Sequence, residues 1–534
     1  MRRTLAVAVC AAAFASGCGG SSKQQQQVLR VGTVGQSLTL NPFAGLQGDY
    51  AAFQNIYPSL AMTRLPTLAF EPYLATGWKA SPDGLTWTFQ IRPHAHWSDG
   101  QPLTAQDAAW TISTILKDRM GATANYAEYV THLASATAPN ATTVVLRYQA
   151  PVANVLAEAG SVAILPRHIW AKAAGGNGSG LASFVNAPSP GHPVVSGGPF
   201  MVTQQQRNAI ELFQRNPRYW GQPSLAGFGI KYYANADAMT TALKNGEIDV
   251  ATSVPPTAVQ SLRSAGLVVA DAPSINFDDL AINTTAGKVS HRELLDPRVR
   301  HALDLAIDRR RIGELVYLGH AAPGSVIDPP ALSRWHAPIA PTPFDVTEAN
   351  RLLDTAGYKR GPGGTRLANG QPMSYKVLLA PTADRELAII AAGFARIGVR
   401  LSSQPVDSKA HFAALSANKY RNFDLSLGSG TAGGLDPDFG LSAFTCMALG
   451  LYNKSGYCNP AYDKLYQAQG ISPQRVAVVA QLQRMIYDER PIAVLTYPDI
   501  LDAWSSHWTG FVESPAGIYN YLVPYSLTGV HRTG

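Results

Sequence analysis

The sequence contains no apolar run of about 20 residues, the length that a helix needs to cross a bilayer. Only 15% of its 534 residues are charged. Gly (47) and Pro (37) together make up about 16% of the chain, below the share of about 25–30% that is typical of low-complexity sequences. The hydrophobic content of 46% excludes a disordered chain. A chain of this length and composition predicts two to four compact lobes, each with a core of its own.

Familiar catalytic motifs are also missing, since the sequence has no G-x-x-x-x-G-K-[ST], H-E-x-x-H, G-x-S-x-G or C-x-x-C. Residues 428–433 (GSGTAG) match G-x-G-x-x-G, but residues 434–437 (GLDP) predict a turn in place of the helix that would bind a pyrophosphate. His94 and His96 would point to one face of a strand, yet they lack a third metal ligand of clear spacing. We therefore expect no enzyme, no metal site and no cofactor.

The N-terminal residues predict export. Two arginines precede the apolar stretch 5–15, which is too short to span a bilayer, and residues 15–18 (ASGC) resemble a bacterial lipobox. In a lipobox the cysteine sulfur receives a diacylglycerol and a peptidase cuts just before it. The pattern predicts a signal peptide over 1–17, a lipidated Cys18 and a flexible tether over 18–27. An ordinary signal peptide is the alternative.

Cysteine usage follows from this interpretation. Of the four cysteines, Cys10 would leave with the signal peptide and Cys18 would carry the lipid, so Cys446 and Cys458 remain. An oxidising compartment favours a disulfide between these two. A pair of unpaired, buried thiols is the alternative.

The net charge of +7 falls to +5 once the two N-terminal arginines are removed, and the basic residues are dispersed. Their one cluster, Arg309–Arg311, lies in the segment 299–318, where apolar residues recur at helical spacing. This predicts the solvated face of one helix. We therefore expect no nucleic acid among the partners, and only mild attraction to an anionic envelope.

Helix and strand patterns alternate along the chain. Leu85–Ile91 alternates apolar and polar residues, which predicts a half-buried strand. Thr104 with Asp107 resembles a capping box and predicts a helix to about Leu116. Further strands are predicted over 29–34, 248–251, 373–379, 399–406 and 492–497, a two-stranded unit over 196–220, and helices over 236–245, 346–356, 384–397 and 474–489. The alternation favours α/β lobes over a solenoid, a propeller or an all-β sandwich.

Eight sequence blocks follow one another in a characteristic order. They are PYLA (72–75), DGLTWTF (83–89), WSDGQPLTAQD (97–107), GGPF (197–200), RNPRYW (215–220), NGEID (245–249), DPRVRHALDLAID (296–308) and NKSGYCNPAYD (453–463). In this order they resemble family 5 of the bacterial extracellular solute-binding proteins, the oligopeptide, dipeptide and nickel receptors of ABC importers. The resemblance runs from about residue 29 to about residue 517.

The resemblance implies an α/β, periplasmic-binding-protein-like fold (type II, cluster C) with two hinged lobes and an extra inserted domain. Lobe I would combine residues 27–57, 194–283 and 497–534, the inserted domain II would be 58–193, and lobe III would be 284–496. The ligand would sit between lobes I and III.

In function, the resemblance implies a substrate-binding lipoprotein that captures oligopeptides, or a related solute, and delivers them to the transmembrane subunits of an ABC permease. It would be a monomer outside the cytoplasm, anchored to the cell membrane through Cys18. A receptor of the same fold for haem, a nickel chelate or a glycoside is the alternative, and a secreted hydrolase is a third hypothesis.

The resemblance also places cleft residues, carried over by position. They are Val34, Gly35 and Gln36 after the first strand, Tyr126 in the inserted domain, and Ser429, Gly430, Thr431 and Gly433 in the glycine-rich segment.

One departure concerns the ligand. Many peptide binders carry a tryptophan, an aspartate for the peptide's ammonium group and an aromatic residue where this chain has Gly430, Gly433 and Gly434. A buried ammonium group needs a partner charge. Either another acid takes this role, with Asp436 and Asp438 near in sequence, or the ligand has no free amine there. The glycines would also widen the cleft for a non-peptide solute.

Overall fold

The computed structural model describes residues 28–35, 37–44, 50–175, 178–381, 383–406, 414–415, 423–518 and 526–533. The predicted signal peptide (1–17), the predicted lipid site Cys18, the predicted tether (18–27) and Gln36 lie outside the described residues. Among the helices that are described, none combines the length and the apolar character needed to cross a membrane.

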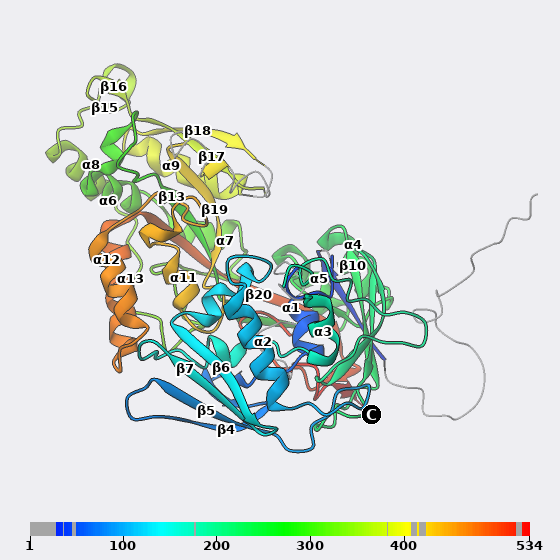
Figure 1. Cartoon of the computed structure of the whole chain (residues 1–534). Helices are drawn as coiled ribbons and strands as arrows, with labels where there is room; N and C mark the ends of the chain where they lie inside the picture. Colours follow the sequence, from blue (N-terminus) through cyan, green and yellow to red (C-terminus); the bar gives the residue numbers. More distant parts are fainter. Residues whose placement is uncertain are drawn as a thin grey trace, which may run out of the picture.

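One sheet of 12 strands runs through two α/β lobes (Figure 1). In spatial order its path is β18 (Arg400–Pro405), β17 (Ser374–Leu379), β19 (Leu425–Thr431), β13 (Asn276–Ile282), β20 (Ile492–Ser505), β11 (Val250–Ala251), β1 (Val28–Val34), β10 (Gly227–Tyr233), β9 (Ile210–Arg215) and β8 (Phe200–Gln206), with β12 (Leu267–Pro273) and β14 (Ala321–Pro323) beside β20. The predicted alternation of helices and strands is confirmed.

Strand β20 belongs to both lobes. Its first residues pair with β13, and its last residues pair with β11 and β12. Between these two blocks, Tyr497 and Pro498 pair with β14. The sequence predicted that this strand ends at Tyr497, eight residues before its actual end at Ser505. A proline usually marks the end of a strand, and nothing in the sequence shows that the strand changes its pairing partner at Pro498.

The first lobe contains β1 and its parallel neighbours β10 and β11, with Leu29 and Val31 fully buried. Three helices belong to it: α1 (Tyr50–Ile56), α4 (Ala236–Lys244) and α5 (Val259–Ser264). The side chain of Asn235 accepts a hydrogen bond from the backbone N–H of Ala238, which caps α4 at the predicted position.

The second lobe carries α6 (Pro297–Leu305), α7 (Arg309–Leu315), α8 (Val346–Thr355), α9 (Asp384–Arg396), α11 (Asp438–Ser442), α12 (Pro460–Gln469) and α13 (Arg475–Glu489), with the short strands β15 (Leu367–Ala368) and β16 (Gln371–Pro372). The prediction of one helix over 299–318 is wrong. Asp308 accepts a hydrogen bond from the N–H of Arg311 and so begins a second helix, α7.

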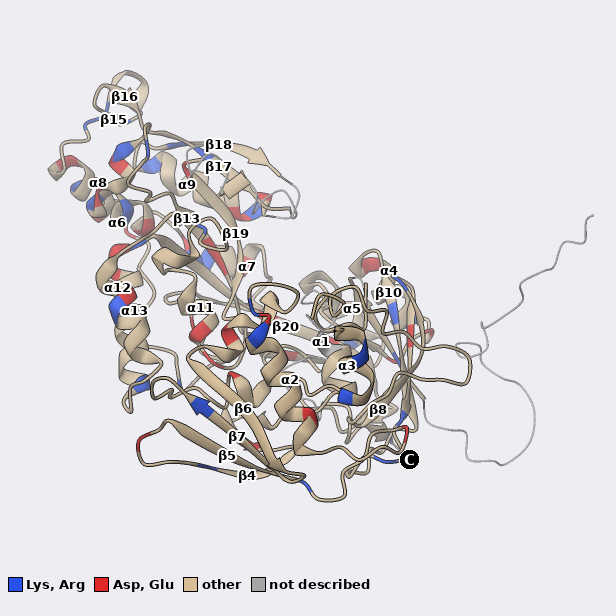
Figure 2. Ribbon diagram, viewed as in Figure 1, with Lys and Arg blue, Asp and Glu red and all other residues tan. Residues whose placement is uncertain are grey.

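The arginine cluster on α7 is not a uniformly solvated face either. Arg309 is 5% exposed, forms a buried ion pair with Asp304 and donates to the carbonyl oxygen of Val494. Only Arg310 and Arg311 are exposed. Figure 2 shows Lys and Arg scattered over both lobes in this view, as the sequence suggested.

The predicted insertion contains an antiparallel sheet of four strands, in the order β4 (Ala75–Ala80), β5 (Thr86–Ile91), β7 (Thr143–Tyr148) and β6 (Leu133–Asn140). A hairpin, β2 (Ala61–Arg64) and β3 (Ala69–Pro72), accompanies the helices α2 (Ala105–Lys117) and α3 (Arg167–Ala174) and the 3-10 turns η2 (Ala124–Val130) and η3 (Ala159–Ser161). The alternating pattern correctly predicted β5, and the capping box correctly predicted α2.

Asp107 should stabilise the insertion more than an ordinary helix cap does. One carboxylate oxygen accepts from the N–H of Thr104 (2.8 Å) and the other from the N–H of Arg167 (3.0 Å), at the start of α3. Asp107→Asn keeps only one acceptor oxygen, so one partly buried N–H is left unpaired. We expect urea unfolding to show a loss of about 1–2 kcal/mol. Asp237→Asn, an exposed first-turn acid of α4, is the control, and equal losses in the two variants would contradict the assignment.

Cys446 and Cys458 form a disulfide bond, which confirms the predicted pair. The bond closes a loop of 12 residues in front of α12. Near the C-terminus, β21 (Trp508–Thr509) pairs with β22 (His531–Arg532) and completes the described strands.

Candidate ligand cavity

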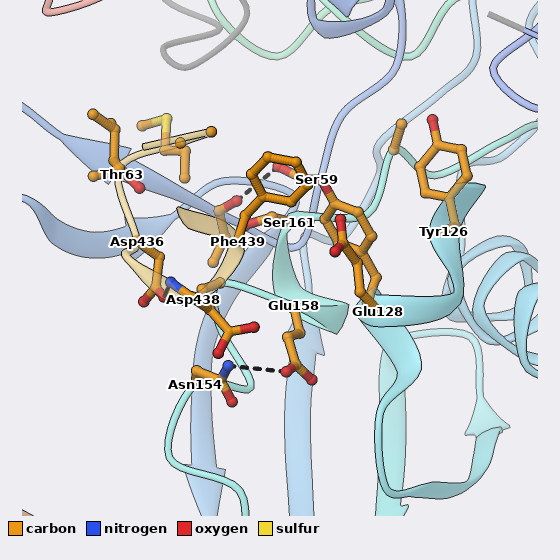
Figure 3. A pocket seen from close by; sticks show the side chains of 18 of the residues that line it. Ser59, Thr63, Tyr126, Glu128, Asn154, Glu158, Ser161, Asp436, Asp438 and Phe439 are labelled. Atoms are coloured by element: carbon orange, nitrogen blue, oxygen red, sulfur yellow. Dashed lines mark hydrogen bonds between the residues drawn. The ribbon is translucent and has the colours of Figure 1, made fainter. Parts of the chain in front are cut away.

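A cavity of about 460 Å³ lies between the insertion and the segment that leads into α11. One wall contains residues of α1, β2, η2 and the segment 154–163, and the other is formed by residues 433–439. Figure 3 shows Glu158 and Asn154 on the first wall and Asp436, Asp438 and Phe439 on the second.

A short turn positions Glu158. Its N–H donates to the carbonyl oxygen of Asn154, and the Asn154 side-chain amide donates to Glu158 Oε1 at 2.9 Å. The N–H of Ala153 donates to the carbonyl oxygen of Gly470, between α12 and α13. The insertion therefore contacts the second lobe directly beside the cavity.

The opposite wall is held by hydrogen bonds from α12 and α13. Arg475 of α13 binds both carboxylate oxygens of Asp436 and also donates to Gln469 Oε1 at 2.7 Å. Asp438 accepts from the amide of Gln469 and from the hydroxyl of Tyr466 at 3.2 Å. These contacts keep both aspartates in place without a ligand.

Three of the acids that line the cavity have raised pKa values. Burial, together with the nearby Asp438 and Asp436, raises the pKa of Glu158 to about 9. Burial and Asp438 raise the pKa of Glu128 to about 7, although its side chain is exposed at the cavity and water screens it more. Burial also raises the pKa of Asp438, with Asp436 as a further cause. No Lys, Arg or His is among the described lining residues.

Two glycines, Gly433 in the second wall and Gly430 in the strand before it, make room for aromatic rings. A Cβ at Gly433, where φ is +80°, would lie 2.1 Å from Cδ1 of Phe439. A Cβ at Gly430 would lie 2.5 Å from the ring of Phe277. The phenyl rings therefore fill the space that a side chain would take, and the expected widening of the cleft is not found at these two positions.

Gly433→Ala should be clearly destabilising for this reason. Left-handed backbone costs an L-residue about 1–2 kcal/mol, and the new methyl group would also displace Phe439. Gly434→Ala is the matched control, because its nearest neighbour would lie 4.0 Å away and its φ is not in the left-handed region. Urea unfolding should show a loss of about 2 kcal/mol for the first variant and under about 0.5 kcal/mol for the second. Similar stability of both would contradict the packing described.

The family model for bacterial extracellular solute-binding proteins, family 5 middle, matches residues 69–448. The chain belongs to this family. Family 5 proteins are extracytoplasmic substrate-binding proteins. The match confirms the family that the ordered sequence blocks suggested.

Two curated relatives and one solved structure illustrate the likeness. Protein XP55 of Streptomyces lividans is 28% identical over 552 residues, which cover 100% of this chain and 96% of that protein. The dipeptide-binding protein of Pseudomonas aeruginosa is 28% identical over 325 residues, 60% of this chain and 59% of that protein. The oligopeptide-binding protein AppA of Bacillus subtilis, solved with a nonapeptide, aligns with a TM-score of 0.75 and 22% identity, covering 96% and 100% of the two chains. The type II periplasmic-binding-protein fold is thereby shown.

The structure brings together only some of the residues that the family resemblance suggested. Tyr126, Gly433 and Asp436 line the cavity. Val34 and Gly35 lie at the end of β1 and do not line it, and Gln36 lies outside the described residues. Three more residues belong to β19, pair with β13 and do not line the cavity either: Ser429, Gly430 and Thr431.

Several lining residues were missed by the cleft assignment from sequence, notably Glu128, Asn154, Glu158 and Phe439. The four-residue spacing of Asn154 and Glu158 was the one local signal. It was weak, because nothing in the sequence shows that the segment 154–158 faces residues 433–439.

Metal-ligating groups come together at one place among the described residues. Ligand atoms of Asp271, His320 and Asp499 lie within 4.8 Å of one another, next to the place where β20 pairs with β14. His320 Nδ1 and Asp271 Oδ2 are hydrogen-bonded at 2.7 Å, so these two ligand atoms have a partner without a metal ion. His94 and His96 do not share a strand face as expected, because His94 has a φ of +57° in a turn and His96 contacts its carbonyl oxygen.

The glycine-rich segment does not form a pyrophosphate site. Its residues through Thr431 belong to β19, and the next helix, α11, begins only at Asp438. The backbone N–H groups of a helix start are therefore absent at Gly433, where a dinucleotide motif would need them.

Proposed function

We propose that this chain is the substrate-binding lipoprotein of an ABC importer, which takes up peptides or a related solute and passes them unchanged to a membrane permease. The observation that supports it most is the cavity between the insertion and residues 433–439, in a chain of family 5. The likeness to a dipeptide-binding protein favours peptides as the solute.

Closure of the lobes is the mechanism that we propose. The division is the one expected from the sequence: 27–57 with 194–283 and 497–534, the insertion 58–193, and 284–496. β20 links the two lobes, and a solute that contacts both walls binds the closed form more tightly than the open form. Such a ligand shifts the population toward the closed state, which the permease would recognise.

Lipidation of Cys18 would anchor the protein outside the cytoplasm, with residues 18–27 as its tether, and the protein would act as a monomer. The alternative of a non-peptide solute (haem, a nickel chelate or a glycoside) loses one support, because aromatic rings fill the space at Gly430 and Gly433.

The test is native mass spectrometry and thermal unfolding with a pooled peptide library. A receptor gives complexes of unchanged peptide mass and a higher unfolding temperature. Peptide fragments in the mixture would instead indicate the hydrolase. A shift with haem or a nickel chelate, and none with peptides, would replace the peptide assignment by the non-peptide alternative.

A further inference from the structure

We infer that the cavity takes a solute that carries a protonated amine, and that Glu158, supported by Asp438 and Glu128, receives this amine. The inference rests on the proposed function, because it assigns the chemistry of that same cavity. Many peptide binders hold the ammonium group with an aspartate at the position of Gly433, in the second lobe. In this chain the negative partner would instead lie in the insertion.

The first support is an unsatisfied pair of buried oxygen atoms. Asn154 is 5% exposed and lines the cavity, and its side-chain oxygen has no hydrogen-bond partner among the described groups. The second carboxylate oxygen of Glu158, also at the cavity, has none either. Both atoms accept hydrogen bonds once Glu158 has released its proton, so a ligand that donates several at once would satisfy them, and an ammonium group has three donors.

The second support is the distribution of charge around these atoms. Glu128 on η2, Glu158 before η3, and Asp436 and Asp438 at the start of α11 all line the cavity, without a basic residue among the described lining. Two further charged residues lie near these acids: Asp328, which is fully buried, and Arg475 of α13. Arg475 is already paired with Asp436 on both oxygens, and its charge offsets only part of the burial that raises the pKa of Glu158 and Asp438.

The third support is the structural reason why Gly433 cannot carry the acid. The ring of Phe439 occupies the place of its Cβ, and this ring stacks on Tyr452 at 5.5 Å between centroids. Glu158 lines the same cavity from the opposite wall, and Figure 3 shows its side chain beside that of Asp438. A cation between them would contact both the insertion and the second lobe.

The two roles that Glu158 could have in binding predict different dependences of ligand affinity on pH. Because its pKa is about 9, Glu158 carries a proton at neutral pH when no ligand is bound. An ammonium ligand must displace the proton, so affinity rises with pH by about tenfold per unit for one proton released. If the neutral acid instead donated a hydrogen bond to a ligand carbonyl, affinity would not rise with pH.

The experiment uses isothermal titration of the full-length protein with three pooled tripeptide libraries between pH 5.5 and 7.5. One has a free α-amine, one is N-acetylated without lysine, and one is N-acetylated with a fixed lysine. A diamine, 1,5-diaminopentane, is the non-peptide probe. This pH range keeps the α-amine mostly protonated, because its pKa is about 7.7–8.0.

We expect an amine-bearing probe to bind, with affinity that rises with pH and with protons released to the buffer. The free-amine and lysine libraries distinguish an α-amine from a side-chain amine. Glu158→Gln should weaken binding about tenfold to hundredfold. The exposed Glu314→Gln on α7 should not change it. Glu128→Gln should have a smaller effect, because its side chain is more exposed.

Equal binding of the lysine-free acetylated library and the free-amine library, or unchanged affinity in Glu158→Gln, would overturn the inference and leave the peptide receptor intact. Binding of the diamine alone would support the inference and remove the peptide. If no amine-bearing probe binds, the inference fails whatever the wider ligand screen shows.

Discussion

Glu158→Gln should stabilise the unliganded protein by about 2–3 kcal/mol at pH 7 while it weakens ligand binding. In the folded chain Glu158 has a pKa of about 9, whereas an ordinary glutamate titrates near 4.5. At neutral pH, folding therefore requires the side chain to take up a proton that the unfolded chain has released. A glutamine needs no proton and still accepts the hydrogen bond from Asn154.

The sign follows from proton binding. Between pH 4.5 and 9 the folded state binds more protons than the unfolded state at this site, so its contribution to stability falls as pH rises. Glu158→Gln should remove that slope, which is at most about 1.4 kcal/mol per pH unit. Urea unfolding at pH 5, 7 and 8.5 measures it. A variant less stable than the wild type at pH 8.5, or one with the same slope, would show that Glu158 is not a strained buried acid.

Loss of the disulfide should have the largest destabilising effect. The bond between Cys446 and Cys458 closes a 12-residue loop, for which chain entropy gives about 3 kcal/mol. The loop also contains Asn453, whose side chain accepts from the N–H groups of Ser455 and Gly456, and Cys446 donates its N–H to Asp463 of α12. The bond therefore restrains the start of α12, which supports the second wall of the cavity through Gln469.

The measurement is urea unfolding of the double variant Cys446→Ser, Cys458→Ser beside the wild type, each with and without a reducing agent. The wild type should lose about 3 kcal/mol on reduction, and the variant should start at the lower value and not respond. If reduction leaves the unfolding midpoint of the wild type unchanged, the cysteines do not form a stabilising bond in the isolated protein.

Elements with a strong local signal were predictable. The alternation before β5, the cap at Thr104 and Asp107, and the helices α4, α8, α9 and α13 follow from patterns within a few residues of one another. The ordered blocks also led to the correct family.

What failed depends on distant partners. The predicted helix over 299–318 is interrupted near residues 306–308. Asp308 caps a new helix there, and Arg309 forms an ion pair with Asp304 and donates to the carbonyl oxygen of Val494. The cavity likewise joins two segments nearly 280 residues apart, and no periodicity reveals such a pairing. Tyr126 and Gly433 were predicted to line the cleft because of the family resemblance, and Asp436 as a nearby acid that could replace the missing one, whereas Glu158 had nothing local to reveal it.

The continuity of β20 restricts how this chain can vary over evolution. Side chains alternate between the two faces of a strand, so one residue added or removed between its two hydrogen-bonded blocks would reverse the faces in one lobe. One of the two cores would then have to be rebuilt entirely. Insertions and deletions among homologues should therefore fall outside Ile492–Ser505. The number of residues between the block that pairs with β13 and the block that pairs with β12 should stay constant.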